Sequence, residues 1–114
     1  MTTPYSAIQP DRAQVDAMTG LVVLDFGTDW CGHCRASRPV VDEVLAARPD
    51  VRHMRVEDGS GRRLGRTFGV KLWPTLVFLR DGAELARLVR PRESQTVADA
   101  LAIFPAQSDR PPQP

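Results

Sequence analysis

The chain has 114 residues, of which 42% are hydrophobic and 25% are charged, and its formal net charge is +1 at neutral pH. This length suits one domain, and the composition is that of a globular protein rather than a disordered chain. The small net charge gives no reason to expect a nucleic acid partner. The longest apolar run, within residues 21–26, is far shorter than the roughly 20 residues that cross a membrane, so we expect no membrane partner.

The first twenty residues contain no basic start followed by an apolar stretch and a small-residue cleavage site, so no secretory signal is read there. The expected compartment is therefore the cytoplasm. The two cysteines, Cys31 and Cys34, lie so close together that a bond between them would close a tiny loop and stabilise the fold little. In a reducing compartment such a pair indicates redox chemistry or a bound metal.

The chain begins with an irregular segment, residues 1–9, that shows no regular spacing of apolar side chains. Pro10-Asp11 is a favourable helix start, and the helix predicted after it ends at Gly20. Residues 21–26 are β-branched and apolar on both faces, as in a central strand that is covered by helices on both sides. Asp25 is the exception in this strand.

A second helix and a second strand follow. From residue 31 to residue 47, apolar side chains recur with helical spacing, which places the two cysteines at a helix start. Pro39 lies inside this pattern, where it removes a backbone hydrogen bond and bends the axis. Residues 51–57 are predicted to form a strand and residues 62–68 a short helix.

The last third of the domain is predicted to be a hairpin followed by a helix. Residues 75–80 and 84–89 form two antiparallel strands, joined by a tight turn at Asp81-Gly82. Ser94 can cap a final helix that runs to about residue 104.

The predicted order, with parallel strands first and a hairpin last, indicates an α/β fold with a mixed central sheet and helices on both faces. The domain spans residues 10–104. Residues 105–114 contain four prolines and few apolar side chains, so we expect a flexible tail.

One short motif, Trp-Cys-Gly-His-Cys at residues 30–34, follows the predicted central strand. Three further features lie in fixed order around it: Asp25 before it, Pro39 after it, and Trp-Pro-Thr at residues 73–75. Together with the Asp81-Gly82 hairpin, this pattern resembles the thioredoxin family over about residues 10–104. The resemblance implies a thioredoxin-like fold and a protein-disulfide oxidoreductase that needs no bound cofactor.

The two cysteines have different expected roles. Cys31 should lie at the first turn of the helix, where unpaired N–H groups and the positive end of the helix dipole favour its thiolate, so it is the expected nucleophile. Cys34, one turn further in, would face the interior and attack the mixed disulfide formed at Cys31. The pair would thus form the redox-active disulfide.

The residues between the cysteines, Gly32 and His33, distinguish this motif from that of thioredoxins, which usually have proline at the second of these positions. Cys-Gly-His-Cys resembles the active sites of protein disulfide isomerases. A cationic imidazole beside Cys31 would stabilise the dithiol and move the potential from about −270 mV toward about −180 mV. We therefore expect a milder reductant than thioredoxin.

By the same resemblance, Asp25 matches the buried carboxylate that accepts the proton of the resolving cysteine through water, a task for which burial would raise its pKa. The alternative is an idle aspartate that is hydrogen-bonded within the strand. Arg55 matches the family's basic residue near that carboxylate, with an exposed strand charge as the alternative.

The Trp73-Pro74 bond is the expected cis peptide bond, which brings a backbone edge up to the sulfurs. With the N–H and C=O of Trp73 free, an extended client segment could pair along residues 73–75 as an added strand, next to Thr75. Trp73 itself narrows the groove, stacks on a partner or simply packs. Trp30 would shield Cys31 or belong to the core. The segment Val89-Arg90-Pro91 lacks the glycine that thioredoxins show beside the site, which leaves partner docking there open.

The expected partners are protein disulfides, with a flavoprotein of the thioredoxin reductase type or glutathione as electron donor, and the expected state is a monomer. Two alternatives remain. A zinc protein could use the cysteines with His33 and His53, although a second cysteine pair is missing. A redox-inactive binding or chaperone module could share the same fold.

Overall fold

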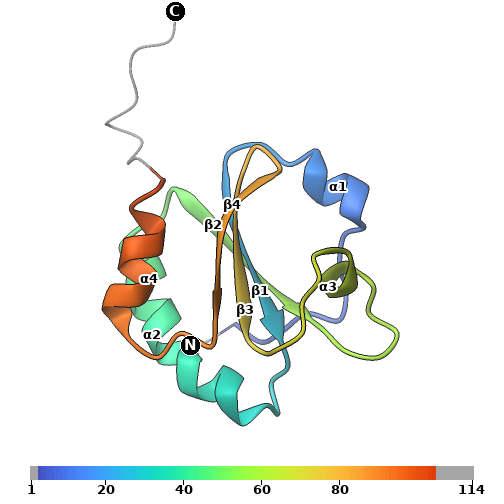
Figure 1. Ribbon diagram of the computed structural model, residues 1–114, viewed down its shortest axis with the longest axis horizontal. Coiled ribbons are helices and arrows are strands. Elements are labelled where there is room, and N and C mark those ends of the chain that lie inside the picture. Colours follow the sequence, from blue (N-terminus) through green and yellow to red (C-terminus); the bar gives the residue numbers. More distant parts are fainter. Residues whose placement is uncertain (1–2, 105–114) are drawn as a thin grey trace, which may run out of the picture.

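The computed structural model describes residues 3–104, so the predicted tail lies outside the described residues (Figure 1). The elements along the chain are α1 (Arg12–Asp16), β1 (Leu21–Gly27), α2 (Gly32–Ala46), β2 (Val51–Glu57), α3 (Leu64–Thr67), β3 (Thr75–Arg80), β4 (Ala83–Val89) and α4 (Ser94–Leu101). Their order is the predicted one. The helices at both ends of the domain are shorter than expected, and Pro39 lies within α2 as predicted.

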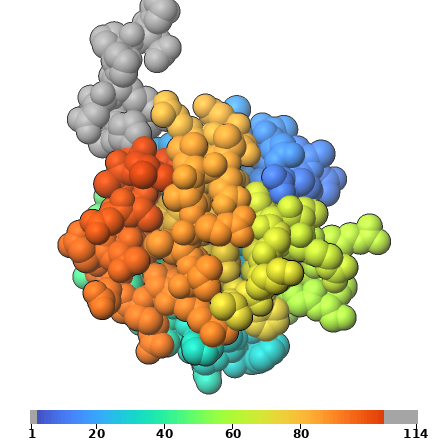
Figure 2. Space-filling view, viewed as in Figure 1, coloured from blue at the N-terminus to red at the C-terminus, as the bar shows by residue number. Residues whose placement is uncertain are grey.

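The four strands form one mixed sheet in the order β2-β1-β3-β4. β1 is parallel to β2 and antiparallel to β3, and β3 is antiparallel to β4. Helices α2 and α4 lie on one face of the sheet, and α1 and α3 lie on the other (Figure 1). β4 is an edge strand whose residues are mostly exposed and run across the front of the molecule in Figure 2. The predicted thioredoxin-like α/β architecture is therefore confirmed.

Every residue of β1 is buried, because helices cover both faces of this strand. Leu21 and Val23 join the apolar cluster with α2 and α4, while Leu24 and Phe26 join the cluster with α1 and α3. Side chains alternate along a strand, so Asp25 points to the same face as Leu21 and Val23, toward α2. The one charged residue of the strand is thus directed at the helix that carries the cysteines.

Local signals explain where α1 begins and how the hairpin turns. Asp11 is the N-cap of α1 and forms a capping box with Gln14. The hairpin turns at Asp81 and Gly82, which both have positive φ (49° and 82°), as a tight two-residue turn requires.

The predicted cap of α4 is wrong. Glu93 is the N-cap residue, without a side-chain cap hydrogen bond, and Ser94 is the first helical residue. The Ser94 hydroxyl instead donates to Glu43 Oε2 on α2 at 2.9 Å. The Ser94 hydroxyl therefore binds Glu43 on another helix and does not cap α4 as predicted.

The N-terminal segment from residue 3 to residue 9 runs along the outer edge of β2. Ser6 forms a parallel bridge with Val56, in which its N–H donates to the Arg55 carbonyl at 3.0 Å and its carbonyl accepts from the Glu57 N–H at 2.9 Å. The irregular segment is thus hydrogen-bonded to the sheet, and this pairing brings Tyr5 over the end of β1. Among the helices of residues 3–104, none is long and apolar enough to cross a membrane.

Candidate active site

The two cysteines lie where β1 gives way to α2. Cys31 is the N-cap residue of α2, with extended backbone, and Cys34 lies on the first turn. Both are free thiols, and both residues are buried: Cys31 is 9% exposed and Cys34 is 1% exposed. Within the described residues they form a small cluster with Tyr5, against which Trp73 packs.

The position of Cys31 favours its thiolate. Burial alone would raise the pKa of Cys31, but the backbone N–H of Cys34, the Cys34 thiol, the backbone N–H of His33 and the charge of Arg90 together lower that pKa. The N–H groups are the unpaired donors of the first helical turn, as predicted. His33 contributes its backbone N–H, and its imidazole is exposed beside the thiol.

The surroundings of Cys34 disfavour its thiolate. Burial raises the pKa of Cys34 to about 11, with the hydrogen bond and charge of Cys31 acting in the same direction and hydrogen bonds from the Thr28 backbone and the Tyr5 hydroxyl acting against it. A thiol of this kind stays protonated at neutral pH. Two cysteines only three positions apart thus differ strongly in how readily they ionise.

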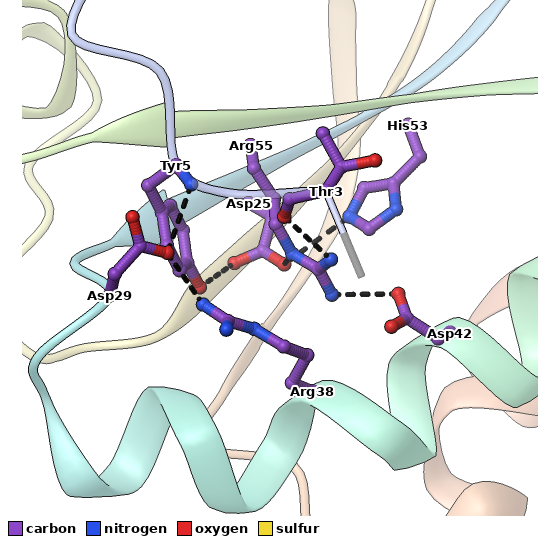
Figure 3. A network of polar contacts seen from close by, with 8 residues as sticks. All are labelled: Thr3, Tyr5, Asp25, Asp29, Arg38, Asp42, His53 and Arg55. Atoms are coloured by element: carbon purple, nitrogen blue, oxygen red, sulfur yellow. Dashed lines mark hydrogen bonds and ion pairs between the residues drawn. The ribbon is translucent and has the colours of Figure 1, made fainter. Parts of the chain in front are cut away.

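Asp25 sits under α2 in a buried polar network (Figure 3). The side chain is 2% exposed. Its Oδ2 lies 3.2 Å from Arg55 Nε and 3.2 Å from His53 Nε2, and both partners come from β2. The register explains this contact, because Asp25 pairs with Arg55 across the parallel strands and residues 53 and 55 point to one face.

Arg55 is buried, which excludes the alternative of an exposed strand charge. It is 5% exposed and also bonds Asp42 Oδ1 of α2 at 2.8 Å and the Thr3 carbonyl at 3.2 Å. Although burial would lower the pKa of Arg55, the charges of Asp25 and Asp42 raise it. Arg55 is therefore a fixed cation that joins Asp25 to the active-site helix.

Tyr5 is a member of this network that the sequence did not indicate. Its hydroxyl donates to Asp25 Oδ1 at 2.6 Å, and its backbone N–H donates to Asp29 Oδ1 at 3.1 Å (Figure 3). The residue is 8% exposed. Burial raises the pKa of the Tyr5 hydroxyl far above its usual range, and the charge of Asp25 is the second cause. The hydroxyl is therefore a permanent proton donor in the resting protein.

The Trp73-Pro74 peptide bond is cis, as expected. The Trp73 ring packs edge-on against Trp30, with 5.7 Å between ring centroids, and its Nε1–H donates to Asp58 Oδ2 at 2.7 Å. Trp30 is 71% exposed, so it does not belong to the core. Thr75 is buried, and its hydroxyl donates to the Leu72 carbonyl at 2.6 Å.

The Trp73 carbonyl is not free, contrary to expectation. Arg90 Nε donates to it at 2.8 Å, and the Arg90 N–H donates to the Pro74 carbonyl at 2.8 Å. Arg90 stands in the segment noted for its missing glycine and has a positive φ of 53°. A charged side chain therefore reaches over the loop that was expected to meet the client.

A metal site finds no support in the part of the chain that the structure describes. Residues 3–104 contain no group of three or more histidine, cysteine or acidic side chains placed to hold a metal ion. His53, the other candidate ligand, faces Asp25 instead.

Gly32, the residue after Cys31, is exposed on the first turn of α2 and has open space around it.

Sequence reasoning missed Tyr5 and Asp42, and it named His53 only as a possible zinc ligand and Arg90 only within a segment beside the site. A usable signal existed for His53, because it alternates with Arg55 on a strand predicted to lie near Asp25. For Tyr5 the sequence offered no signal, since the surrounding segment has no periodicity and its partner lies twenty residues away.

The comparisons with known proteins agree with this geometry. Residues 10–102 match the family model described as thioredoxin. A thioredoxin of Chlamydia muridarum is 31% identical over 95 residues, which cover 83% of this chain and 93% of that protein. The solved structure of reduced thioredoxin 2 from Pseudomonas aeruginosa PAO1 is 53% identical, covers 90% of this chain and 95% of that one, and has a TM-score of 0.83. Trxlp from Edwardsiella tarda is 27% identical, with a TM-score of 0.69 over 86% and 95% of the two chains. The chain therefore belongs to the thioredoxin family and is a thiol–disulfide oxidoreductase.

Proposed function

We propose that the chain reduces protein disulfides, with Cys31 as the attacking nucleophile and Cys34 as the resolving thiol. One observation carries these roles: the pKa of Cys31 is lowered, whereas that of Cys34 is raised to about 11. Because the thiolate is the nucleophile, Cys31 reacts first with a client disulfide. Cys34 stays protonated until the mixed disulfide has formed, and it then attacks Cys31 and releases the reduced client.

Asp25 accepts the proton that Cys34 must lose. Cys34 is 1% exposed, so bulk water has little access to its proton. Asp25 is a buried carboxylate on the face of β1 that lies under α2, and its hydrogen bonds to Arg55 and His53 keep it in place. A positioned base of this kind contributes about 10²- to 10⁴-fold to a rate.

Clients bind beside residues 73–75, next to the two tryptophans. Trp30 is largely exposed, and with Trp73 it offers an aromatic surface for an extended segment. The Trp73 carbonyl has a second lone pair beside the one that Arg90 uses, so a client N–H can still bond there. Backbone pairing at this edge is therefore weaker than at a free carbonyl.

We further propose that this protein is a milder reductant than thioredoxin and that it works as a monomer in the cytoplasm. A stabilised Cys31 thiolate favours the dithiol form, which moves the potential from about −270 mV toward about −180 mV. A dithiol of this kind serves as a reductant only where a donor keeps it reduced, which suits a reducing compartment. The donor is a flavoprotein of the thioredoxin reductase type or glutathione.

Two matched variants test the roles in an insulin-reduction assay with dithiothreitol as donor. Cys31→Ser should lose activity to background, because no nucleophile remains. Cys34→Ser should accumulate mixed disulfides through Cys31, visible by mass spectrometry without reductant. Full activity in Cys31→Ser would contradict the assignment. Equilibration with glutathione buffers measures the reduction potential of the Cys31–Cys34 pair. A potential at or below about −270 mV would contradict the proposal that the protein is a milder reductant than thioredoxin.

A further inference from the structure

The Tyr5 hydroxyl occupies the space between the Cys34 thiol and Asp25. Its O–H donates to Asp25 Oδ1 at 2.6 Å. The same hydroxyl interacts with the Cys34 thiol, with which Tyr5 shares a buried cluster. Gly27 lines this space: a Cβ on it would lie 2.5 Å from the Cys34 sulfur and 2.9 Å from the Tyr5 hydroxyl oxygen. Sulfur and oxygen thus lie against one face of Gly27, where any larger residue would clash with them.

The Tyr5 side chain is held in this place from several sides. Its backbone N–H bonds Asp29, and the next residue pairs with β2. The guanidinium groups of Arg38 and Arg55 lie 5.6 Å and 5.9 Å from the ring centroid, within the range of cation–π attraction (Figure 3). The hydroxyl is therefore positioned by the fold and is not a mobile surface group.

The two oxygens of Asp25 have different partners. Oδ2 faces Arg55 and His53, which both lie on β2. Oδ1 accepts from the neutral Tyr5 hydroxyl. A proton can therefore arrive at Oδ1 without displacing the ion pair at Oδ2, and Tyr5 is the group through which it arrives.

The resolving step needs such a path. In the resting dithiol, Cys34 is hydrogen-bonded to Cys31. Once Cys31 is joined to a client, its sulfur no longer carries a charge, so Cys34 needs another proton acceptor. We propose that the Tyr5 hydroxyl relays the Cys34 proton to Asp25 in place of a water molecule, an inference that rests on the roles proposed above for Cys34 and Asp25.

The step balances without a further reactant. The Cys34 proton passes to the Tyr5 oxygen as the Tyr5 proton passes to Asp25 Oδ1, and tyrosine ends unchanged. The Cys34 sulfur bonds to Cys31, the bond between Cys31 and the client breaks, and the client leaves as a thiolate. The dithiol is oxidised by two electrons, the client disulfide is reduced by two, and Asp25 ends protonated.

The test is single-turnover reduction of an excess of a peptide disulfide, quenched with acid and resolved by mass. Tyr5→Phe keeps the ring near both arginines but removes the hydroxyl. It should slow the decay of the mixed disulfide by about 10- to 100-fold, within the range for a lost proton-transfer group. The decay rate should also rise more steeply with pH above neutrality than in the wild type, since hydroxide must then take the Cys34 proton. A wild-type rate and pH profile in Tyr5→Phe would overturn the relay.

Two further variants separate a relay from a structural effect. Asp25→Asn should slow the same step, and the double variant Tyr5→Phe/Asp25→Asn should be no slower than the slower single variant, because both lie on one path. If the double variant slowed the decay by the product of the two single-variant factors, the relay would be overturned. The control variant Ser37→Ala removes a different buried hydroxyl. The Ser37 hydroxyl lies on α2 and donates to the Pro91 carbonyl at 2.6 Å, and its removal should leave the decay rate unchanged. An equal loss in Ser37→Ala would assign the effect to loosening of α2 and overturn the relay.

The first step distinguishes failure of the relay from failure of the proposed roles. In the Cys34→Ser background, Tyr5→Phe should form the mixed disulfide at an unchanged rate, because Cys31 reacts without the relay. If Cys34→Ser itself formed no mixed disulfide at Cys31, the proposed cysteine roles would be wrong and the relay would fall with them. A slower first step caused by Tyr5→Phe would overturn the relay alone.

Discussion

The two faces of the sheet differ in a way that separates folding from chemistry. Under α1 and α3, the described part of the sheet buries an apolar cluster that includes Val22, Leu24 and Leu79, with no buried charge and with the hydrogen-bonded hydroxyl of Thr75 at its margin. Under α2 and α4, an apolar cluster around Val23 and Phe78 gives way at the Cys34 end to the buried charges of Asp25 and Arg55. The face under α1 and α3 therefore serves mainly to stabilise the fold. The face under α2 and α4 also holds buried charges beside the thiols, and their desolvation costs free energy.

The comparison teaches where stability and reactivity can be changed independently. Burying an apolar side chain stabilises a domain by about 1.5–3 kcal/mol. Burying an ion pair gains little net stability, because the desolvation cost offsets much of the attraction. We therefore expect substitutions on the α1/α3 face to change stability alone, and changes near the thiols to change ionisation.

The largest expected effect is on the apolar face. Leu79→Ala should lower the free energy of unfolding by about 2–5 kcal/mol, because Leu79 is fully buried and its removal leaves a cavity. Urea denaturation measures the loss. The matched control is Leu85→Ala on β4, where a leucine 48% exposed should change stability by less than about 0.5 kcal/mol. A changed alkylation rate of Cys31 in folded Leu79→Ala would break the separation of the two faces.

The second effect is a loss of stability at alkaline pH. An ordinary cysteine with a pKa near 9 ionises in the unfolded chain, while folded Cys34 keeps its proton to about 11. Between these values the unfolded state binds fewer protons, so stability falls as pH rises, by about 2–3 kcal/mol in total. Cys31 has a lowered pKa, so its contribution instead rises as pH increases toward 9.

Denaturation of the reduced protein across this pH range, with Cys34→Ala as reference, isolates the Cys34 contribution. The alkaline fall of the wild type should be steeper than that of the variant. Parallel curves for the two proteins would show that burial does not hold the Cys34 proton.

The smallest expected effect concerns Arg90, whose charge helps to lower the pKa of Cys31. Arg90→Gln should raise that pKa, because the Cys31 thiolate loses a nearby positive charge. The matched control is Arg90→Lys, which keeps the charge at the same strained backbone position and should shift the pKa less. Thiolate absorbance against pH in the Cys34→Ser background measures the shift, and equal shifts in the two variants would exclude a charge effect.

Sequence reasoning predicted the sheet because apolar periodicity and turn residues are local signals. The strand over residues 51–57 and the hairpin at Asp81-Gly82 both follow from them. The cysteine pair and the cis bond before Pro74 followed from resemblance to a family. The Ser94 cap failed because Glu43, 51 residues away, competes for the same hydroxyl.

The remaining site residues depend on contacts that no local pattern encodes. Tyr5 reaches Asp25 only because Ser6 pairs with the outer edge of β2. Arg90 bonds the Trp73 carbonyl and adopts a positive φ, in a segment that lacks the glycine of thioredoxins. Strand register and edge pairing decide both placements, and they are properties of the folded sheet.

The central claim is that the fold makes two neighbouring cysteines ionise differently, and alkylation of the reduced protein measures this directly. Iodoacetamide modification of each cysteine, resolved by peptide mass across pH 4 to 12, gives both midpoints in one experiment. The account predicts a midpoint for Cys31 clearly below the ordinary value near 9 and one for Cys34 near 11. Equal midpoints, or a Cys34 that reacts at lower pH than Cys31, would contradict it.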